Sequence, residues 1–280
     1  MPTPTCPLQA PVEIRHWDCL LDAMSSPESD SFIKTLAFGC VALQNRLVDL
    51  VSSPPPRSFH SSQLQEILDR AAKRSDISDH LTTLFWEAMA GPSGLMVELG
   101  VRGGESTFVL ERVARLKGGL PLVSIDIEDC SDVSDYDHWF FVRTDDVKFA
   151  GEFDSWTRAR GLSSRINLLF IDTSHLFDHT VLELKHWVPL LAEGGRLVFH
   201  DTNQRRLYHR RDGSWGIGWN NRGVMSAIEH MLDCHFNERM DFVEYVKGWM
   251  IRHEACCNGF TVMTRLTSDP ASPVSVSPSS

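Results

Sequence analysis

Short apolar runs separated by polar, glycine-containing segments dominate the middle of the chain. Five such runs have the composition of buried strands, and they lie at 95–99, 122–125, 140–142, 166–171 and 196–199. A longer stretch between the last two, 178–191, has the apolar spacing of a helix. This alternation predicts an α/β fold, in which a mostly parallel sheet carries helices on both of its faces.

The segment before the first strand has a different pattern. Apolar residues recur there at helical spacing: Phe32, Leu36, Leu43, Leu47 and Leu50. Two further helices are expected at 61–73 and 77–90, after which a Gly-Pro-Ser-Gly stretch interrupts the pattern. We therefore predict a helical region over residues 1–92 and a sheet domain over 93–266. The tail at 267–280, which is rich in Ser and Pro and has no aromatic residue, is expected to be disordered.

The first strand runs directly into a glycine-rich turn. Gly100 and Gly104 let the backbone come close to a ligand, and Ser106 or Thr107 can cap the helix that follows. A dinucleotide-binding turn would need the pattern Gly-x-Gly-x-x-Gly, but Arg102 stands where the second glycine belongs. The turn therefore favours a ligand other than a dinucleotide.

An acidic residue precedes this turn. Glu98 and the spacing Glu-x-Gly-x-x-x-Gly resemble motif I of class I S-adenosylmethionine-dependent methyltransferases. S-adenosylmethionine carries a sulfonium and an ammonium group, and these cations suit an acidic turn better than a pyrophosphate would. The resemblance implies that the cofactor is S-adenosylmethionine, with its methionine end over the turn.

Carboxylates also follow the next strands, at the edge where open α/β sheets bind their ligands. Asp126 can accept hydrogen bonds from both hydroxyls of a ribose. Asp145 and Asp146 stand where members of the family hold the adenine amino group. The resemblance thus implies a cofactor site made of nine residues: Glu98, Gly100, Arg102, Gly104, Ser106, Asp126, Asp145, Asp146 and Asp172.

The same resemblance implies how the sheet is completed. The pattern after the fifth strand predicts a helix at 223–235 and strands at 241–246 and 259–265. These elements would complete the Rossmann-like, seven-stranded sheet of the family. Its final hairpin places one antiparallel strand in an otherwise parallel sheet.

Two segments narrow the resemblance further. Residues 170–175 and 187–202 resemble the small-molecule O-methyltransferases that share a metal-site layout with catechol O-methyltransferase, including antibiotic-sugar methyltransferases. In that group strand-end acids and amides hold Mg²⁺, and Asp172, His200 and Asp201 match the three positions. His200 departs from the pattern, because magnesium binds imidazole poorly. A softer divalent ion, catalysis without a metal, and a turn-capping role for Asp201 stay open.

His175 is the predicted catalytic residue. It lies three residues after Asp172, where the catechol-type enzymes carry their catalytic lysine. A neutral alcohol attacks a sulfonium slowly unless a base removes its proton, and the ordinary pKa of histidine lies close to neutral pH. His200 is the next candidate for this base. A local role at the helix entry stays open for His175, and a solvated or packing role is expected for His179.

The segment after the fifth strand, 203–222, is too long for an ordinary connection and predicts a binding loop or lid. Its five arginines suggest an acceptor that carries a carboxylate or a phosphate. Four residues are the candidates for contact with this acceptor: Arg205, Arg206, Trp215 and Trp219. The tryptophans could stack on a sugar or an aromatic ring. A solvated loop whose tryptophans pack on other parts of the protein is the alternative.

Composition restricts the class of protein. The chain has 280 residues and a formal net charge of -10, which argues against binding to nucleic acid or to an anionic membrane. No apolar run reaches the ~18 residues needed to cross a bilayer, and the first residues lack the basic and apolar regions of a secretory signal. Seven cysteines without a Cys-x-x-Cys pair suit a reducing compartment. We therefore expect a cytoplasmic protein without nucleic-acid or membrane partners, and a homo-oligomer stays open.

Together these observations predict an S-adenosylmethionine-dependent O-methyltransferase. Its expected acceptor is a hydroxyl of a small metabolite, such as a sugar or a phenolic natural product, and Mg²⁺ or another divalent cation would assist. N-methylation, hydroxylase-like chemistry on the same scaffold, and a non-catalytic partner protein are the alternatives, because a fold does not fix a function. The joint presence of Glu98, Asp126, Asp172 and His175 favours an active enzyme.

Overall fold

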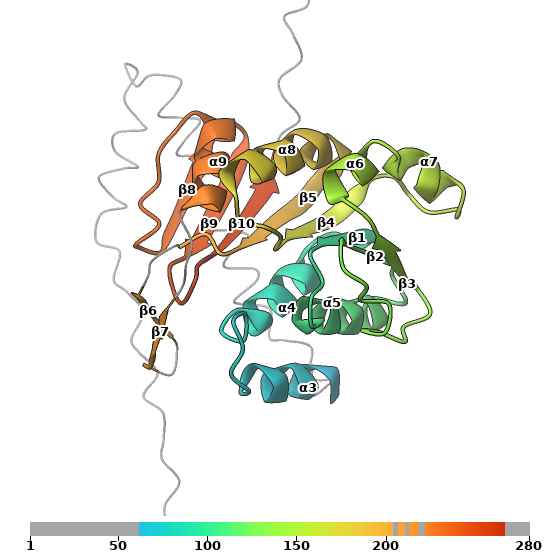
Figure 1. Cartoon of the computed structure of the whole chain (residues 1–280), viewed down its shortest axis with the longest axis horizontal. Coiled ribbons are helices and arrows are strands. Elements are labelled where there is room, and N and C mark those ends of the chain that lie inside the picture. The colour runs from blue at the N-terminus through green and yellow to red at the C-terminus, as the bar shows by residue number, and fades with distance from the viewer. Residues whose placement is uncertain (1–61, 204–206, 211–212, 218–221, 267–280) are drawn as a thin grey trace, which may run out of the picture. The chain divides into compact units, whose positions relative to one another are not determined.

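One mixed sheet organises the protein, and its strands follow the order β3-β2-β1-β4-β5-β10-β9-β8 (Figure 1). The five apolar runs form its parallel part: β1 Leu95–Leu99, β2 Leu122–Asp126, β3 Trp139–Arg143, β4 Ile166–Ile171 and β5 Leu191–His200. The other three strands complete it: β8 Phe242–Val246, β9 Trp249–Glu254 and β10 Phe260–Arg265. The predicted α/β class and its mostly parallel core are confirmed.

This computed structural model describes residues 62–203, 207–210, 213–217 and 222–266. Several predictions from the sequence lie outside these residues: the helices before residue 62, the roles of Arg205, Arg206 and Trp219, and the disordered tail. The chain from Ser62 onward clusters into one compact unit.

Helices cover both faces of the sheet. Their bounds are α3 Ser62–Ala71, α4 Leu81–Ala90, α5 Glu105–Leu116, α6 Asp146–Ala150, α7 Phe153–Arg158, α8 Phe177–Trp187 and α9 Gly223–Leu232. Figure 1 shows α8 and α9 on one face, and α4 and α5 on the other. A short 3₁₀ helix, Val188–Leu190, joins α8 to β5, and a separate hairpin pairs β6 Leu207–His209 with β7 Trp215–Ile217. In the part of the chain that the structure describes, no helix has the length and apolar character needed to span a membrane.

The prediction of seven strands is wrong, because the sheet has eight. The missed strand is β9, which pairs with β8 through a turn at Lys247 and Gly248. Both turn residues have positive φ, 47° and 84°, as the tight turns of β-hairpins require. Lys-Gly is not one of the dipeptides that usually mark this turn, so no hairpin was predicted there. As a result two strands, β8 and β10, run against the parallel set instead of one.

Aromatic packing fixes α8 against the sheet. Trp187, at the end of α8, is completely buried and meets Phe153 edge to face, with ring centroids 5.0 Å apart. Both rings belong to the core that also contains Leu169 and Ile171 of β4. Burying a large apolar side chain contributes ~1.5–3 kcal/mol. This packing fixes the carboxyl-terminal end of α8 on the sheet.

Candidate active site

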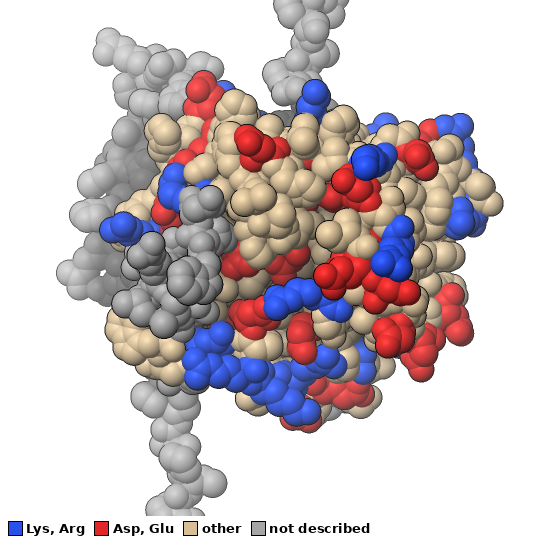
Figure 2. All heavy atoms as spheres, viewed as in Figure 1, with Lys and Arg blue, Asp and Glu red and all other residues tan. Residues whose placement is uncertain are grey.

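A cavity of about 710 Å³ opens at the carboxyl ends of the parallel strands. Residues from the loops after β1, β2, β3 and β4 line it, together with Asp76 and Ile77 from the connection between α3 and α4. Seven of the nine predicted cofactor residues lie on its wall: Gly100, Arg102, Ser106, Asp126, Asp145, Asp146 and Asp172. Figure 2 shows acidic side chains around a depression near the middle of this face. The location agrees with the rule that open α/β sheets bind ligands at this edge.

The turn after β1 depends on its glycines. Gly100 has φ +88°, and a Cβ atom there would lie 2.1 Å from the carbonyl oxygen of Asp172. The amide of Asp172 donates to the carbonyl of Leu99 at 2.9 Å, so the ends of β1 and β4 are held in direct contact. Gly104, with φ +75°, is the N-cap of α5, and no side chain caps this helix. The expected cap by Ser106 or Thr107 is therefore wrong.

The two hydroxyls instead serve Glu98, which is completely buried behind the turn. Its Oε2 accepts hydrogen bonds from Thr107 at 2.8 Å and from Ser124 at 2.6 Å, and Ser106 also bonds this carboxyl group. Oε1 has no hydrogen-bond partner among the described residues. Burial raises the pKa of Glu98 to about 7, more than the hydroxyls lower it. Because its unpartnered oxygen needs a donor, Glu98 fits the ammonium group that the sequence predicted for this end of the site.

Asp126 joins the turn to β2. Its Oδ2 accepts from the amides of Val101 at 2.7 Å and Arg102 at 3.1 Å, and its Oδ1 accepts from the amide of Glu128 at 2.9 Å. The sequence indicated a ligand-binding role but not this contact with the backbone of the turn. Each carboxylate oxygen has two lone pairs, so these three bonds leave one acceptor position, on Oδ1, for a ribose hydroxyl. The ribose role stays a prediction.

The two acidic residues after β3 have different surroundings. Asp145 caps α6, because its side chain accepts from the amide of Lys148 at 2.9 Å. Asp146 is buried and lies against His179 of α8, with Oδ1 3.2 Å from Nε2. His179 was expected to be solvated or to pack, and the structure instead places it between two carboxylates, since it also lies 3.4 Å from Glu183.

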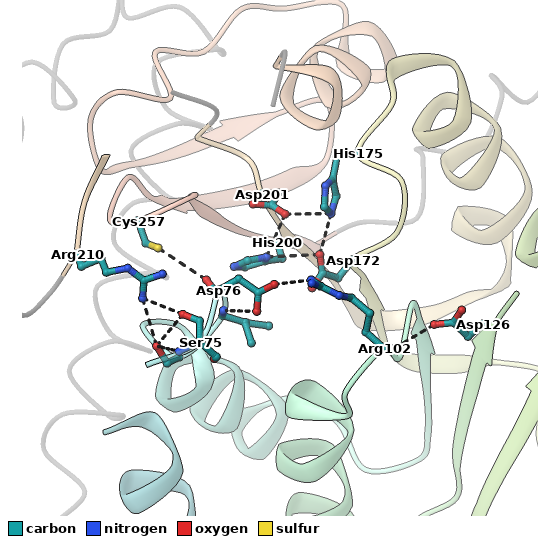
Figure 3. Close-up of polar contacts among 12 residues, drawn as sticks. Ser75, Asp76, Arg102, Asp126, Asp172, His175, His200, Asp201, Arg210 and Cys257 are labelled. Carbon is teal, nitrogen blue, oxygen red and sulfur yellow. Dashed lines mark hydrogen bonds and ion pairs between the residues drawn. The ribbon is translucent and has the colours of Figure 1, made fainter. Parts of the chain in front are cut away.

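The predicted catalytic and metal residues converge at the ends of β4 and β5 (Figure 3). Nε2 of His175 lies 3.0 Å from Asp172 Oδ1 and 3.0 Å from Asp201 Oδ2. Nδ1 of His200, which is 2% exposed, lies 3.4 and 3.5 Å from the same two oxygens. His175 and Asp201 have φ values of 56° and 57°, in the left-handed region that such residues rarely adopt. Strained backbone of this kind clusters at functional sites.

In this cluster, burial and the neighbouring charges shift the pKa values in opposite directions. Burial favours the neutral forms of Asp172 and Asp201, but the nearby histidines outweigh it and lower both pKa values, that of Asp172 to about 2. Burial also favours a neutral His175, but its hydrogen bonds to the two carboxylates raise its pKa to about 10. The pKa of His200 is raised in the same way. The expectation that His175 would titrate near neutral pH does not hold for this arrangement.

The same residues can hold a metal ion. One ligand atom each from Asp172, His175 and Asp201 lies within 4.8 Å of the others. Two carboxylate oxygens and one imidazole nitrogen suit Mn²⁺, Fe²⁺ or Zn²⁺, and the two oxygens alone suit Mg²⁺ with water completing its shell. The donor set therefore fits a divalent cation. The role predicted for His200 as a ligand stays a prediction.

Comparison with known proteins agrees with this geometry. Residues 97–202, which include the glycine turn and both strand ends of the cluster, match the family model described as "Methyltransferase domain". Over these residues the chain resembles a methyltransferase domain. No curated protein sequence matches the chain significantly.

Solved structures similar to this chain include three enzymes. CalS11, a TDP-rhamnose 3'-O-methyltransferase of calicheamicin biosynthesis, is 12% identical, with 78% of this chain and 99% of that chain covered and a TM-score of 0.45. An O-methyltransferase from Bacillus cereus in complex with SAH is 15% identical, with coverages of 79% and 96% and a TM-score of 0.43. MycE of the mycinamycin pathway, in complex with Mg, SAH and mycinamycin VI, is 16% identical, with coverages of 77% and 58% and a TM-score of 0.46.

The candidate site includes residues that the sequence did not indicate. Asp76 forms an ion pair with Arg102 across the cavity wall (Figure 3). Arg210 holds the connection that carries Asp76, because its guanidinium contacts Asp79 Oδ2 at 2.9 Å and the carbonyl of Ser75 at 2.8 Å. No motif or spacing links residue 76 to residues 102 and 210. These contacts depend on tertiary structure alone.

The described residues of the predicted acceptor loop do not all have the expected role. Two of its five arginines are bonded within the protein: Arg210 to Asp79, and Arg222 to Glu229 and Glu238. Trp215 is 61% exposed and is not among the residues that line the cavity. Arginine content therefore overstated the positive charge available to an acceptor, since ion pairs within the protein use these two side chains.

Proposed function

We propose that this protein is an O-methyltransferase that transfers the methyl group of S-adenosylmethionine to a hydroxyl of a small metabolite, assisted by a divalent cation. The observation that carries the proposal is the meeting of Asp172, His175 and Asp201 at the wall of the cavity that begins at the glycine turn. A donor held over that turn would point its methyl group toward this cluster. A sugar or a phenolic natural product is the acceptor class we expect.

The donor half of the site binds and orients. The glycine turn at Gly100 accommodates the methionine end, and the unpartnered Oε1 of Glu98 accepts a hydrogen bond from that end. Asp126 holds the ribose, and Asp145 or Asp146 lies near the adenine. When bound, S-adenosylmethionine supplies an electrophilic methyl group on a sulfonium. The chain's own task is to hold that carbon in line with the attacking oxygen.

The acceptor half removes a proton. His175 accepts the proton of the attacking hydroxyl at Nε2, which it can do only when its imidazole is neutral. While Asp172 and Asp201 are both ionised and no cation balances their charge, their hydrogen bonds keep a proton on this nitrogen. They are also the oxygens that would hold the divalent cation, whose positive charge favours the ionised acceptor. The proton on His175 and the cation thus compensate the same negative charge.

Isothermal titration and a turnover assay test this proposal together. We expect binding of S-adenosylmethionine and S-adenosylhomocysteine, and release of S-adenosylhomocysteine when a panel of catechols and nucleotide sugars is supplied with Mg²⁺ or Mn²⁺. Asp172→Asn should retain cofactor binding and lose turnover. Cofactor binding without turnover on any hydroxylated acceptor, but with turnover on amines, would replace O-methylation by N-methylation. An absence of cofactor binding would contradict the proposal altogether.

A further inference from the structure

A second cluster of ligand-type side chains takes no part in the proposed proton transfer, although one member, Asp146, is also a candidate for the adenine contact. Asp146 of α6 meets His179 and Glu183 of α8, and we call these three residues the α6–α8 cluster. His179 and Glu183 are four residues apart, so they project from the same side of the helix. Nε2 of His179 lies 3.2 Å from Asp146 Oδ1 and 3.4 Å from Glu183 Oε1. Glu183 is completely buried and Asp146 is 6% exposed.

Two buried carboxylate oxygens of this cluster lack partners. Oδ2 of Asp146 and Oε2 of Glu183 receive no hydrogen bond from the described residues. The two carboxyl groups also contact each other, and burial raises the pKa of Glu183 to about 7. Two buried acceptors cannot satisfy one another without a proton or a cation between them, because an ionised carboxylate has no hydrogen to donate.

We propose that the α6–α8 cluster is a zinc site, with one ligand each from Asp146, His179 and Glu183. Zinc binds histidine nitrogen and carboxylate oxygen in proteins, and a site with three protein ligands keeps a fourth position open. Bonds of ~2.0–2.1 Å in a tetrahedron place neighbouring ligand atoms about 3.3–3.4 Å apart. The observed 3.2 and 3.4 Å from Nε2 of His179 to the two carboxylate oxygens lie close to that separation.

The surroundings support a bound ion. Thr173 donates to Glu183 Oε1 at 2.6 Å, which is the kind of outer contact that orients a metal-binding carboxylate. Asp146 and His179 line the cavity, so an ion can reach the cluster from solvent. The two carboxylates and the dication balance in charge, and His179 binds as neutral imidazole. Zinc at this position would tie α6 to α8 and fix the cavity wall beside Asp145, without touching Asp172 or Asp201.

Zinc binding is tested in a background that removes the other candidate site. The double variant Asp172→Asn/Asp201→Asn, stripped with a chelator, is titrated with Zn²⁺ against a competing dye, and with Co²⁺ monitored by visible absorption. We expect one equivalent of Zn²⁺ and a tetrahedral Co²⁺ spectrum. Adding Glu183→Gln or His179→Ala should weaken binding at least tenfold and abolish that spectrum. His186→Ala, an exposed histidine on the same helix, is the matched control and should change neither.

Folding is followed separately, so that loss of binding is not mistaken for loss of structure. Zn²⁺ should raise the melting temperature of the background variant and of His186→Ala, and should not raise that of Glu183→Gln or His179→Ala. Absence of Zn²⁺ binding by the background variant would overturn the proposal. It would mean that Asp146 and Glu183 share a proton instead. Unchanged affinity in both Glu183→Gln and His179→Ala would also overturn it, even if Zn²⁺ binds elsewhere.

Discussion

Two clusters built from the same kinds of side chain border one cavity, but they rest on different kinds of backbone. Asp172, His175 and Asp201 come from loops after strands, and two of the three have left-handed φ values. Asp146, His179 and Glu183 come from helices with ordinary backbone, and Glu183 is fully buried. The difference teaches that strained, accessible loops present groups to a reacting ligand, while helices hold groups that the fold itself uses.

Among the tests of this contrast, we expect the largest effect when the imidazole of His175 is removed. His175→Ala should lower kcat by ~10²–10⁴-fold, the usual worth of a general base. Affinity for S-adenosylmethionine should change little, because the imidazole faces the acceptor. Steady-state kinetics and calorimetry on the same preparations measure both, with His186→Ala as the exposed control. Near-normal kcat in His175→Ala would transfer the base role to His200.

The second-largest effect is expected from the removal of divalent ions, which should affect the two clusters differently. Chelation should lower turnover by about a hundredfold or more, since a catalytic cation is worth several kcal/mol, and Mg²⁺ or Mn²⁺ should restore it. Asp172→Asn should prevent this recovery of turnover. Glu183→Gln should instead lower the melting temperature that is measured in the presence of Zn²⁺. Full activity after exhaustive chelation would leave Asp172 and Asp201 as groups that orient the acceptor and His175.

A third strand-end carboxylate tests whether position alone makes a residue catalytic. Asp126→Ala should weaken S-adenosylmethionine binding by roughly ten- to a hundredfold, because a hydrogen bond to a charged group is worth ~1.5–3 kcal/mol. At saturating cofactor kcat should change much less. Asp126→Asn, which retains an acceptor for the turn amides, should lose less affinity than the alanine variant. Equal affinities for wild type and Asp126→Ala would place the ribose elsewhere.

The smallest expected effect is on pH-dependent stability in chelated protein. The pKa values of His175 and His179 are raised from 6.5 to about 10, so the folded state binds more protons between these pH values than the unfolded state. Stabilisation by each group is thus complete below about pH 6.5 and lost as pH rises through about 10, with a slope of at most about 1.4 kcal/mol per pH unit. Urea unfolding from pH 7 to 10 should show a shallower fall for His175→Ala and His179→Ala than for wild type. Equal slopes would mean that neither imidazole is held protonated.

Much of the parallel sheet could be read from the sequence, because each strand there contains a mostly apolar run between turn signals. The hairpin of β8 and β9 could not, since Lys247-Gly248 carries no usual turn dipeptide. The strand-end cluster was predictable, because residues that end neighbouring parallel strands must meet at one edge. Glu183 was missed, although its spacing of four from His179 on a predicted helix was a usable signal.

The protonation of the cluster was beyond sequence reasoning for a different reason. A pKa depends on distances to other charges, and the sequence places Asp201 twenty-six residues away from His175. Only the folded chain brings both carboxylates within 3.0 Å of one imidazole nitrogen. The contact between Asp76 and Arg102 has the same origin, because it joins the α3–α4 connection to the turn after β1.

That connection has an evolutionary consequence. Asp76 and Ile77 line the cavity but lie outside residues 97–202, the stretch that matches the methyltransferase domain. The wall of the cavity is therefore built in part by residues outside the stretch that resembles a methyltransferase domain. Substitutions between α3 and α4 would change this part of the wall without changing any residue of that stretch.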